Sequence, residues 1–265
     1  MKKIYSFRNL SQQQANMWNS FSLDNEIKNC PQWNTLNYFL KYLPKDKPIL
    51  EAGCGLGIWL IYLRNKGYNV EGIDYDWNVI SKLNEMRPDL PARQGDICNL
   101  PYKDNSLGAY ISLGVLEHFE EGAEKPLSEA KRVLMPGGIA IFTLPFNNFF
   151  RRMVAHPLRE LYLLVHWALK GNKYFSEYRY SKKEAYSMII EAGFHVIETD
   201  INDFINKNRS LGLWSEFPFL QSKELYSLNI LGKVAAYLMN SLSINILSAG
   251  ILVVAQKPCA DTKEH

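Results

Sequence analysis

Apolar and polar residues follow two rhythms along this chain, one typical of buried strands and one typical of amphipathic helices. Short apolar runs end at turn residues, and a helical stretch follows each of them. The β-α alternation with short turns predicts a parallel sheet with helices on both faces. Strands are expected at 48–52, 69–74, 92–95, 107–113 and 139–144, and helices at 56–66, 76–87 and 126–134.

This rhythm stops after Pro145 and returns at Ser181. Within the intervening segment, residues 157–169 predict a helix that is apolar around most of its circumference. Ser181 and Glu184 form a capping box that starts a further helix. Strands at 194–201 and 250–256 then enclose a second insertion with an amphipathic helix, for which apolar residues at helical spacing are the evidence.

These breaks divide the chain into segments. The first one is polar with interspersed aromatic residues; Trp18 and Trp33 either line a cap over a ligand or only dock the segment on the core. The expected division is an N-terminal helical cap (1–45), a ligand-binding core (46–145), a helical insertion or lid (146–180), the rest of the core (181–257) with an insertion (202–248), and a polar tail (258–265).

Composition narrows the classes of function. Hydrophobic residues make up 47% of the 265 residues, which is ample for a packed core. The net charge of +3 is small and the Lys and Arg residues are scattered, so we expect no nucleic acid partner. No apolar run reaches the ~18–20 residues that a membrane-spanning helix needs. The chain begins without an apolar signal segment, and its four cysteines and five histidines lack metal-ligand spacing, so we expect a cytoplasmic protein without a metal site.

A glycine-rich turn joins the first strand to the first helix. The strand ends at Glu51, and Gly53, Gly55 and Gly57 alternate after it. Glycine allows a tight turn and a close approach of a ligand to the backbone. A dinucleotide-binding fingerprint would place its third glycine at Ile58, which argues against a nicotinamide cofactor.

Acidic residues also end the next strands. Asp74 closes the second strand, 21 residues after Gly53, where an acid in such folds holds the two hydroxyls of a ribose. Four motifs then occur in order: Glu51 to Gly57, Asn69 to Asp74, Arg93 to Ile97, and Leu107 to Phe119 with Arg132 to Gly138. Together they resemble the class I S-adenosylmethionine-dependent methyltransferases.

This resemblance implies an α/β fold with a seven-stranded, mostly parallel, doubly wound sheet and helical insertions that form a lid. It also implies S-adenosyl-L-methionine as methyl donor and S-adenosyl-L-homocysteine as product. Glu51 would lie near the donor's amino group, Asp74 at the ribose and Asp96 at the adenine, although Glu51 and Asp74 have alternatives as helix caps and Asp96 as a turn residue. The implied donor site is Glu51, Gly53, Cys54, Gly55, Gly57, Asp74, Tyr75, Asp96, Ile97, Leu113 and Gly114.

The acceptor side is less defined by the resemblance. His118 lies near the expected methyl position and would act as a general base for a hydroxyl acceptor, or else serve packing and loop shape. Arg179 would bind a carboxylate or phosphate, or else form a surface ion pair. The predicted acceptor-binding residues are Asn147, Tyr178, Arg179 and Tyr180.

We therefore expect a methyltransferase that acts on an O, N or C nucleophile of a small, apolar or aromatic acceptor, such as a lipid, quinone or polyketide. The alternatives are a donor-binding scaffold without turnover and a nicotinamide-dependent oxidoreductase. The apolar helix at 157–169 packs on the core or on a partner chain, lines a substrate pocket, or makes a shallow peripheral membrane contact helped by Arg151, Arg152 and Arg159. The sequence leaves the oligomeric state open.

Overall fold

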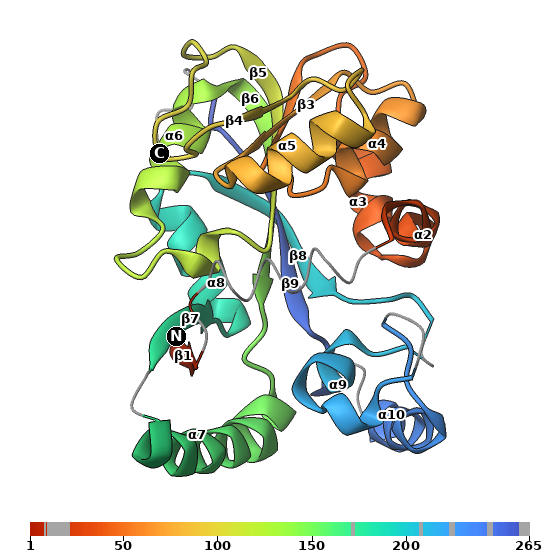
Figure 1. Ribbon diagram of the computed structural model, residues 1–265. Coiled ribbons are helices and arrows are strands. Elements are labelled where there is room, and N and C mark those ends of the chain that lie inside the picture. The colour runs from red at the N-terminus through yellow and green to blue at the C-terminus, as the bar shows by residue number, and fades with distance from the viewer. Residues whose placement is uncertain are drawn as a thin grey trace.

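A seven-stranded sheet forms the centre of the protein (Figure 1). The computed structural model describes residues 1–7, 9, 22–170, 173–206, 209–222, 226–242 and 246–259. The strand order is β4-β3-β2-β5-β6-β9-β8, and β9 is antiparallel to both of its neighbours. This confirms the expected mostly parallel fold class. The strands are β2 (Ile49–Ala52), β3 (Val70–Asp74), β4 (Ala92–Gln94), β5 (Leu107–Leu113), β6 (Leu134–Pro145), β8 (His195–Asn202) and β9 (Gly250–Gln256).

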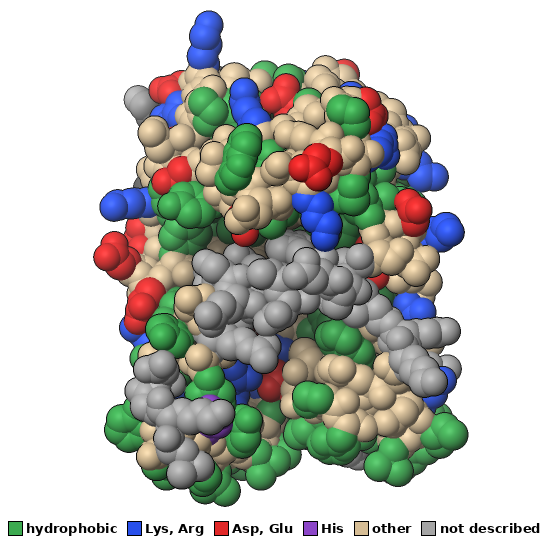
Figure 2. Space-filling model, in the orientation of Figure 1, with side chains coloured by type: hydrophobic (Ala, Val, Ile, Leu, Met, Phe, Trp, Pro, Cys, Tyr) green, Lys and Arg blue, Asp and Glu red, His purple; other side chains and the backbone are tan. Residues whose placement is uncertain are grey.

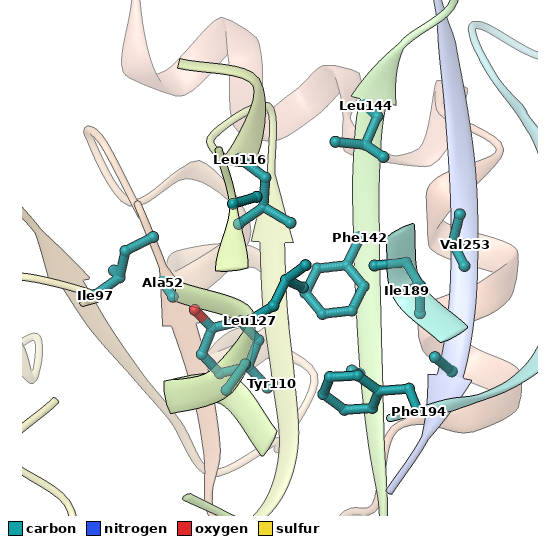
Figure 3. Packing of buried hydrophobic residues seen from close by; sticks show 14 of the residues in the cluster. Ala52, Ile97, Tyr110, Leu116, Leu127, Phe142, Leu144, Ile189, Phe194 and Val253 are labelled. Carbon is teal, nitrogen blue, oxygen red and sulfur yellow. The ribbon is translucent and has the colours of Figure 1, made fainter. Parts of the chain in front are cut away.

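Helices cover both faces of this sheet, each over its own apolar cluster. Along β9, Ile251 and Val253 face one cluster while Leu252 and Val254 face the other, as the alternation of side chains in a strand requires. Figure 3 shows the first cluster, in which Tyr110 and Phe142 from adjacent strands lie beside side chains from the covering helices. The helices are α6 (Glu124–Val133) and α8 (Lys182–Glu191) over this cluster, and α2 (Leu23–Asn29), α3 (Thr35–Tyr42), α4 (Ile58–Asn65) and α5 (Trp77–Met86) over the other.

Local chemistry explains where several helices begin. Asp76 is the N-cap of α5, and its side chain accepts a hydrogen bond from the backbone N–H of Asn78 at 2.9 Å. The expected capping box of α8 is present, because the Ser181 hydroxyl accepts from the Glu184 N–H and the Glu184 carboxylate accepts from the Ser181 N–H. One boundary differs: β6 begins at Leu134, which pairs with Leu107, rather than at the expected position 139.

The N-terminal segment departs from the expected helical cap. It begins with the strand β1 (Lys2–Ser6), which pairs in antiparallel fashion with β7 (Tyr174–Arg179) of the first insertion. A short helix, η1 (Cys30–Gln32), then separates α2 from α3. Trp33 packs on Phe204 of the second insertion with ring centroids 4.2 Å apart, which supports the docking role. Trp18 lies outside the described residues.

Two lobes extend from the sheet at the end where β6 and β8 finish (Figure 1). Each lobe is built by one insertion, and the helix expected at 157–169 lies within α7. After η2 (Leu116–His118), the first lobe contains the π-helix η3 (Arg151–Ala155) and α7 (His156–Lys170). The second contains α9 (Leu211–Glu216), η4 (Pro218–Leu220) and α10 (Ile230–Leu242).

Candidate functional site

The glycine loop after β2 is held in place by backbone hydrogen bonds. The N–H groups of Gly53 and Cys54 both donate to the carbonyl of Ile73, at 2.7 and 2.9 Å. Gly53, Gly55 and Gly57 all have positive φ angles, of 83°, 54° and 72°. A Cβ on Gly53 would lie only 2.3 Å from Val115 Cγ2. The loop therefore needs glycine at this position both for its backbone angles and for the close approach of the segment after β5.

Asp74 lies between this loop and α5. One of its carboxylate oxygens accepts from the Gly55 N–H at 2.8 Å, and the other accepts from the Asp76 N–H at 3.0 Å. Burial raises the pKa of Asp74, and these backbone hydrogen bonds oppose the increase. Since a carboxylate oxygen accepts more than one hydrogen bond, both oxygens retain capacity for a ligand's hydroxyl groups.

Glu51, at the end of β2, is a buried carboxylate with an unsatisfied oxygen. Its Oε2 atom has no hydrogen-bond partner among the described residues. Burial, and to a smaller extent the charge of Asp74, raises the pKa of Glu51 to about 8. Such a group is costly to bury alone and is stabilised by a cationic ligand atom. The corner thus fits a ligand that has both an ammonium group and a ribose.

A cavity of about 260 Å³ lies next to this corner, at the carboxyl ends of β5 and β6. Gly114, which directly follows β5, is part of its wall, so the glycine corner and the cavity approach each other along this segment. Side chains from both insertions complete the wall. The lining residues are Gly114, Glu117, Thr143, Leu144, Pro145, Arg151, Glu177, Arg179, Asn202, Leu211, Ser215, Ala249 and Gly250.

Buried ion pairs connect the two insertions at this cavity. Arg151 of η3 and Arg179 of β7 both contact Glu216 Oε1 of α9, at 3.0 and 2.6 Å. Arg179 also donates to Glu177 at 2.7 Å. Although burial raises the pKa of Glu216, the two guanidinium groups hold it below its usual value. All the charges of this cluster are paired, two cations with two carboxylates.

Glu117 contributes another buried carboxylate to the cavity wall. Its Oε2 atom has no hydrogen-bond partner in the described part of the chain. Burial raises the pKa of Glu117 to about 7, and the charge of His118 opposes the shift. A Cβ on Gly114 would lie 3.5 Å from Glu117 Oε1, so the carboxylate lies close to the end of β5.

The chain resembles known proteins in this region. Residues 50–142 match the family model described as "Methyltransferase domain". A "Probable S-adenosylmethionine-dependent methyltransferase" of Mycolicibacterium smegmatis is 32% identical over 37% of this chain and 38% of its own length. A tRNA (carboxymethyluridine(34)-5-O)-methyltransferase of Arabidopsis thaliana is 30% identical over 56% of this chain and 34% of its own length. Each match thus spans little more than a third of the relative.

Solved structures show the same fold. An S-adenosylmethionine-dependent methyltransferase from Methanosarcina mazei aligns with a TM-score of 0.57 at 18% identity, over 84% of this chain and 97% of that chain. Residues 50–142 thus match a methyltransferase domain, and the sheet that contains them has the fold of the S-adenosylmethionine-dependent methyltransferases. The family's donor has both an ammonium group and a ribose, the two features that the glycine corner fits.

The remaining predicted donor-binding residues differ in their surroundings. Cys54 is buried, and its sulfur would lie 2.8 Å from a Cβ on Gly72, so it packs inward against β3. Asp96 accepts from the Cys98 N–H at 2.8 Å, which is a local turn, while Ile97 packs in the core. Tyr75 is largely exposed and Leu113 half-buried.

Among the predicted acceptor-binding residues, Arg179 lines the cavity, and it is buried rather than at the surface. His118 Nδ1 lies 2.7 Å from the carbonyl of Ser176, which ties η2 to β7. The Tyr178 hydroxyl donates to the Glu120 carbonyl at 2.9 Å, to the same effect. Tyr180 packs in the core, and the side chain of Asn147 contacts His156.

Sequence reasoning missed Glu117 and Glu216 as functional residues. The available signal for Glu117 was an acid directly after the apolar run that ends the fourth strand. Glu216 offered none, since nothing in the sequence links it to Arg179. In the described ranges, no group of three His, Cys, Asp or Glu side chains is arranged for a metal ion. No helix in those ranges is long and apolar enough to cross a membrane.

Proposed function

We propose that this protein transfers the methyl group of S-adenosylmethionine to a small, largely apolar acceptor held between its two insertions. The main support is the position of Gly114 in the cavity wall. The cavity there borders the glycine corner (the loop 53–57 with Glu51 and Asp74), which we call the donor corner from here on. The acceptor's nucleophilic atom forms a bond to the methyl carbon while the sulfur–carbon bond breaks. The bond's electron pair stays on sulfur, and S-adenosylhomocysteine leaves.

The donor corner orients this reaction. Glu51 in its ionised form accepts from the donor's ammonium group, and Asp74 accepts from the ribose hydroxyls. Positioning of this kind contributes up to ~7–11 kcal/mol in favourable intramolecular cases. The sulfonium supplies the activated methyl group, so the protein mainly has to align the acceptor with that group and to exclude water.

The balance of positive and negative side chains at the cavity favours an acceptor that carries no strong negative charge. The charges of Arg151 and Arg179 are balanced by those of Glu177 and Glu216, so these four side chains carry no excess positive charge that would favour a phosphate. The wall also contains apolar groups such as Leu144 and Leu211. These features favour a lipid, quinone or polyketide-like molecule whose polar end reaches Glu117.

Glu117 is the best-placed general base for a hydroxyl acceptor. It faces the cavity with an unpartnered oxygen, and its pKa of about 7 is suited to proton transfer near neutral pH. The carboxylate takes the acceptor's proton as the oxygen–methyl bond forms. His118 remains the alternative base, although its Nδ1 atom is engaged with Ser176.

A tRNA acceptor is the second candidate, because the Arabidopsis relative is named for methylation of tRNA. Both acceptors are tested together by incubating the protein and radiolabelled donor with a lipid extract and, separately, with total tRNA. Label in the lipid fraction is expected. Label in tRNA alone would replace the acceptor proposal but leave the donor assignment intact.

Calorimetry with S-adenosylhomocysteine tests the donor assignment. We expect Asp74→Ala to lower affinity about 10- to 100-fold, because each lost hydrogen bond to a charged group contributes ~1.5–3 kcal/mol. Asp76→Ala is the matched control, since it removes a neighbouring acid that caps α5 and should leave affinity within a few-fold. Unchanged binding by Asp74→Ala refutes the site. Donor binding without methyl transfer to any fraction supports the scaffold alternative.

A further inference from the structure

The helix α7 presents an apolar stripe to solvent. Leu158, Leu161 and Val165 recur at helical spacing on one side, and Leu158 and Leu161 are 54% and 60% exposed. The other side of the helix, with Leu163 and Trp167, lines a groove against β1. Because this inner side already faces the chain, the outer stripe is left uncovered by the described residues.

The helix α10 has the same character in the second lobe. The fully buried Ala236 identifies the side of α10 that packs against the rest of the protein. Its outer side is more exposed than that of α7, with Ile230 at 82% and Tyr237 at 73%. The spacing of the exposed large apolar residues places them on one face of the helix. They are Ile230, Leu231, Val234, Tyr237 and Leu238.

Both helices lie at the same end of the molecule. Figure 1 shows α7 and α10 at the far ends of the two lobes, away from α4 and α5. Figure 2 shows hydrophobic side chains gathered along this end of both lobes. Two apolar faces on separate insertions thus border one broad surface, and the acceptor cavity lies between the insertions that present them.

Positive charge accompanies this surface. The groove on the inner side of α7 contains Lys2, Lys3, Arg159 and Lys173, of which Lys2 pairs with Glu160 and Lys3 with Glu120. Two exposed cations lie on or next to the helices themselves, Arg152 in η3 and Lys233 in α10. Arg151, which the sequence had suggested as a membrane-facing cation, is instead buried against Glu216.

We propose that α7 and α10 dock this protein on a lipid bilayer with anionic headgroups. Amphipathic helices bind such surfaces by inserting their apolar face and by attracting anionic lipids to flanking cations. A second copy of the chain fits less well, because a symmetric contact through this end would bring the same cations together. This inference rests on the proposed function, because docking at this end delivers a lipid acceptor directly to the cavity between the lobes.

The test is co-sedimentation of the full chain with vesicles. One set contains phosphatidylcholine with about a third phosphatidylglycerol, and the other contains phosphatidylcholine alone. We expect binding to the anionic set, with at least about tenfold weaker binding to the neutral set or in high salt. The variants Leu158→Asp/Leu161→Asp and Ile230→Asp/Leu231→Asp should each reduce binding to anionic vesicles by at least about tenfold.

Leu40→Asp on α3 is the matched control, because Leu40 is 55% exposed but lies outside both lobes. Binding of S-adenosylhomocysteine by every variant reports correct folding and keeps this test separate from the donor assignment. Absence of wild-type binding to anionic vesicles refutes the proposal, as does equal binding by wild type and both lobe variants. Conversion of a wild-type dimer to a monomer by the lobe variants, measured by light scattering, would assign these faces to a second copy instead.

Discussion

The donor corner and the acceptor cavity are adjacent but are constructed in different ways. The donor corner consists of a short glycine loop and the carboxylates at two strand ends, and its geometry is set largely by backbone hydrogen bonds. The cavity instead depends on side chains from η2, η3, β7 and α9, which are far apart in the sequence. A donor site built on backbone tolerates few residue types, whereas a cavity built from side chains can change its acceptor by substitution.

The largest expected effect is a loss of turnover on substitution of Glu117, a residue of the cavity, without a loss of donor affinity. Glu117→Gln removes the base but keeps the size of the side chain, so turnover of a hydroxyl acceptor should fall about 10²- to 10⁴-fold. Donor affinity, measured by calorimetry, should stay within a few-fold. His118→Ala is the comparison variant, and near-normal turnover is expected from it. If the losses are reversed between these two variants, His118 is the base.

Stability should also depend on the cavity. Glu216→Gln leaves two buried guanidinium groups with one carboxylate, so the free energy of unfolding should fall by about 3–5 kcal/mol. Asp89→Asn breaks the exposed pair with Arg87 and should change the free energy of unfolding very little, because solvent screens this pair. Urea denaturation measures both. A small effect of Glu216→Gln would mean that the two insertions are not coupled through this residue.

A pair of glycine variants examines how the donor corner is built. Gly53 and Gly67 have nearly the same φ, 83° and 85°, but a Cβ on Gly53 meets Val115 whereas a Cβ on Gly67 meets nothing within 4 Å. Both alanine variants bear the same backbone strain. Only Gly53→Ala adds overpacking, so it should lose a further ~1–3 kcal/mol of stability. Equal losses of stability in the two variants would show that contact with Val115 does not constrain the glycine loop.

The pH dependence of stability should reflect Glu51. Its pKa is raised to about 8 in the folded protein from an ordinary value of 4.5, so the native state keeps a proton that the unfolded chain has lost between these pH values. The stability that this group contributes is therefore fully present below pH 4.5 and is lost as the pH rises from there through 8, by at most ~1.4 kcal/mol per pH unit. Glu51→Gln should flatten this decrease in urea denaturation series. Glu26, Glu117 and Asp203, whose pKa values are raised in the same direction, are expected to contribute to the slope that remains.

The sequence predicted the sheet well because its signals are local. Alternation along the strands, the Asp76 cap and the Ser181–Glu184 capping box each act within a few residues, and they locate the core elements to within a few positions. The pairing of β1 with β7 joins residues about 170 positions apart and leaves no local trace.

The cavity was predictable only in part, for the same reason. Arg179 was named as an acceptor residue, but its burial depends on Glu216, which the sequence does not connect to it. Glu117 was hidden beside the more conspicuous His118. The unexpected features are thus contacts between insertions, where the chemistry follows from the fold rather than from the order of residues.

The position of β9 has a consequence for synthesis of the protein. This last strand, Gly250–Gln256, lies inside the sheet between β6 and β8 rather than at its edge. Until it leaves the ribosome, β6 and β8 have no partner between them and the two apolar clusters lack its alternating side chains. The sheet of the nascent chain therefore cannot close before β9 has been synthesised, and during that interval the unpaired edges of β6 and β8 need protection from aggregation.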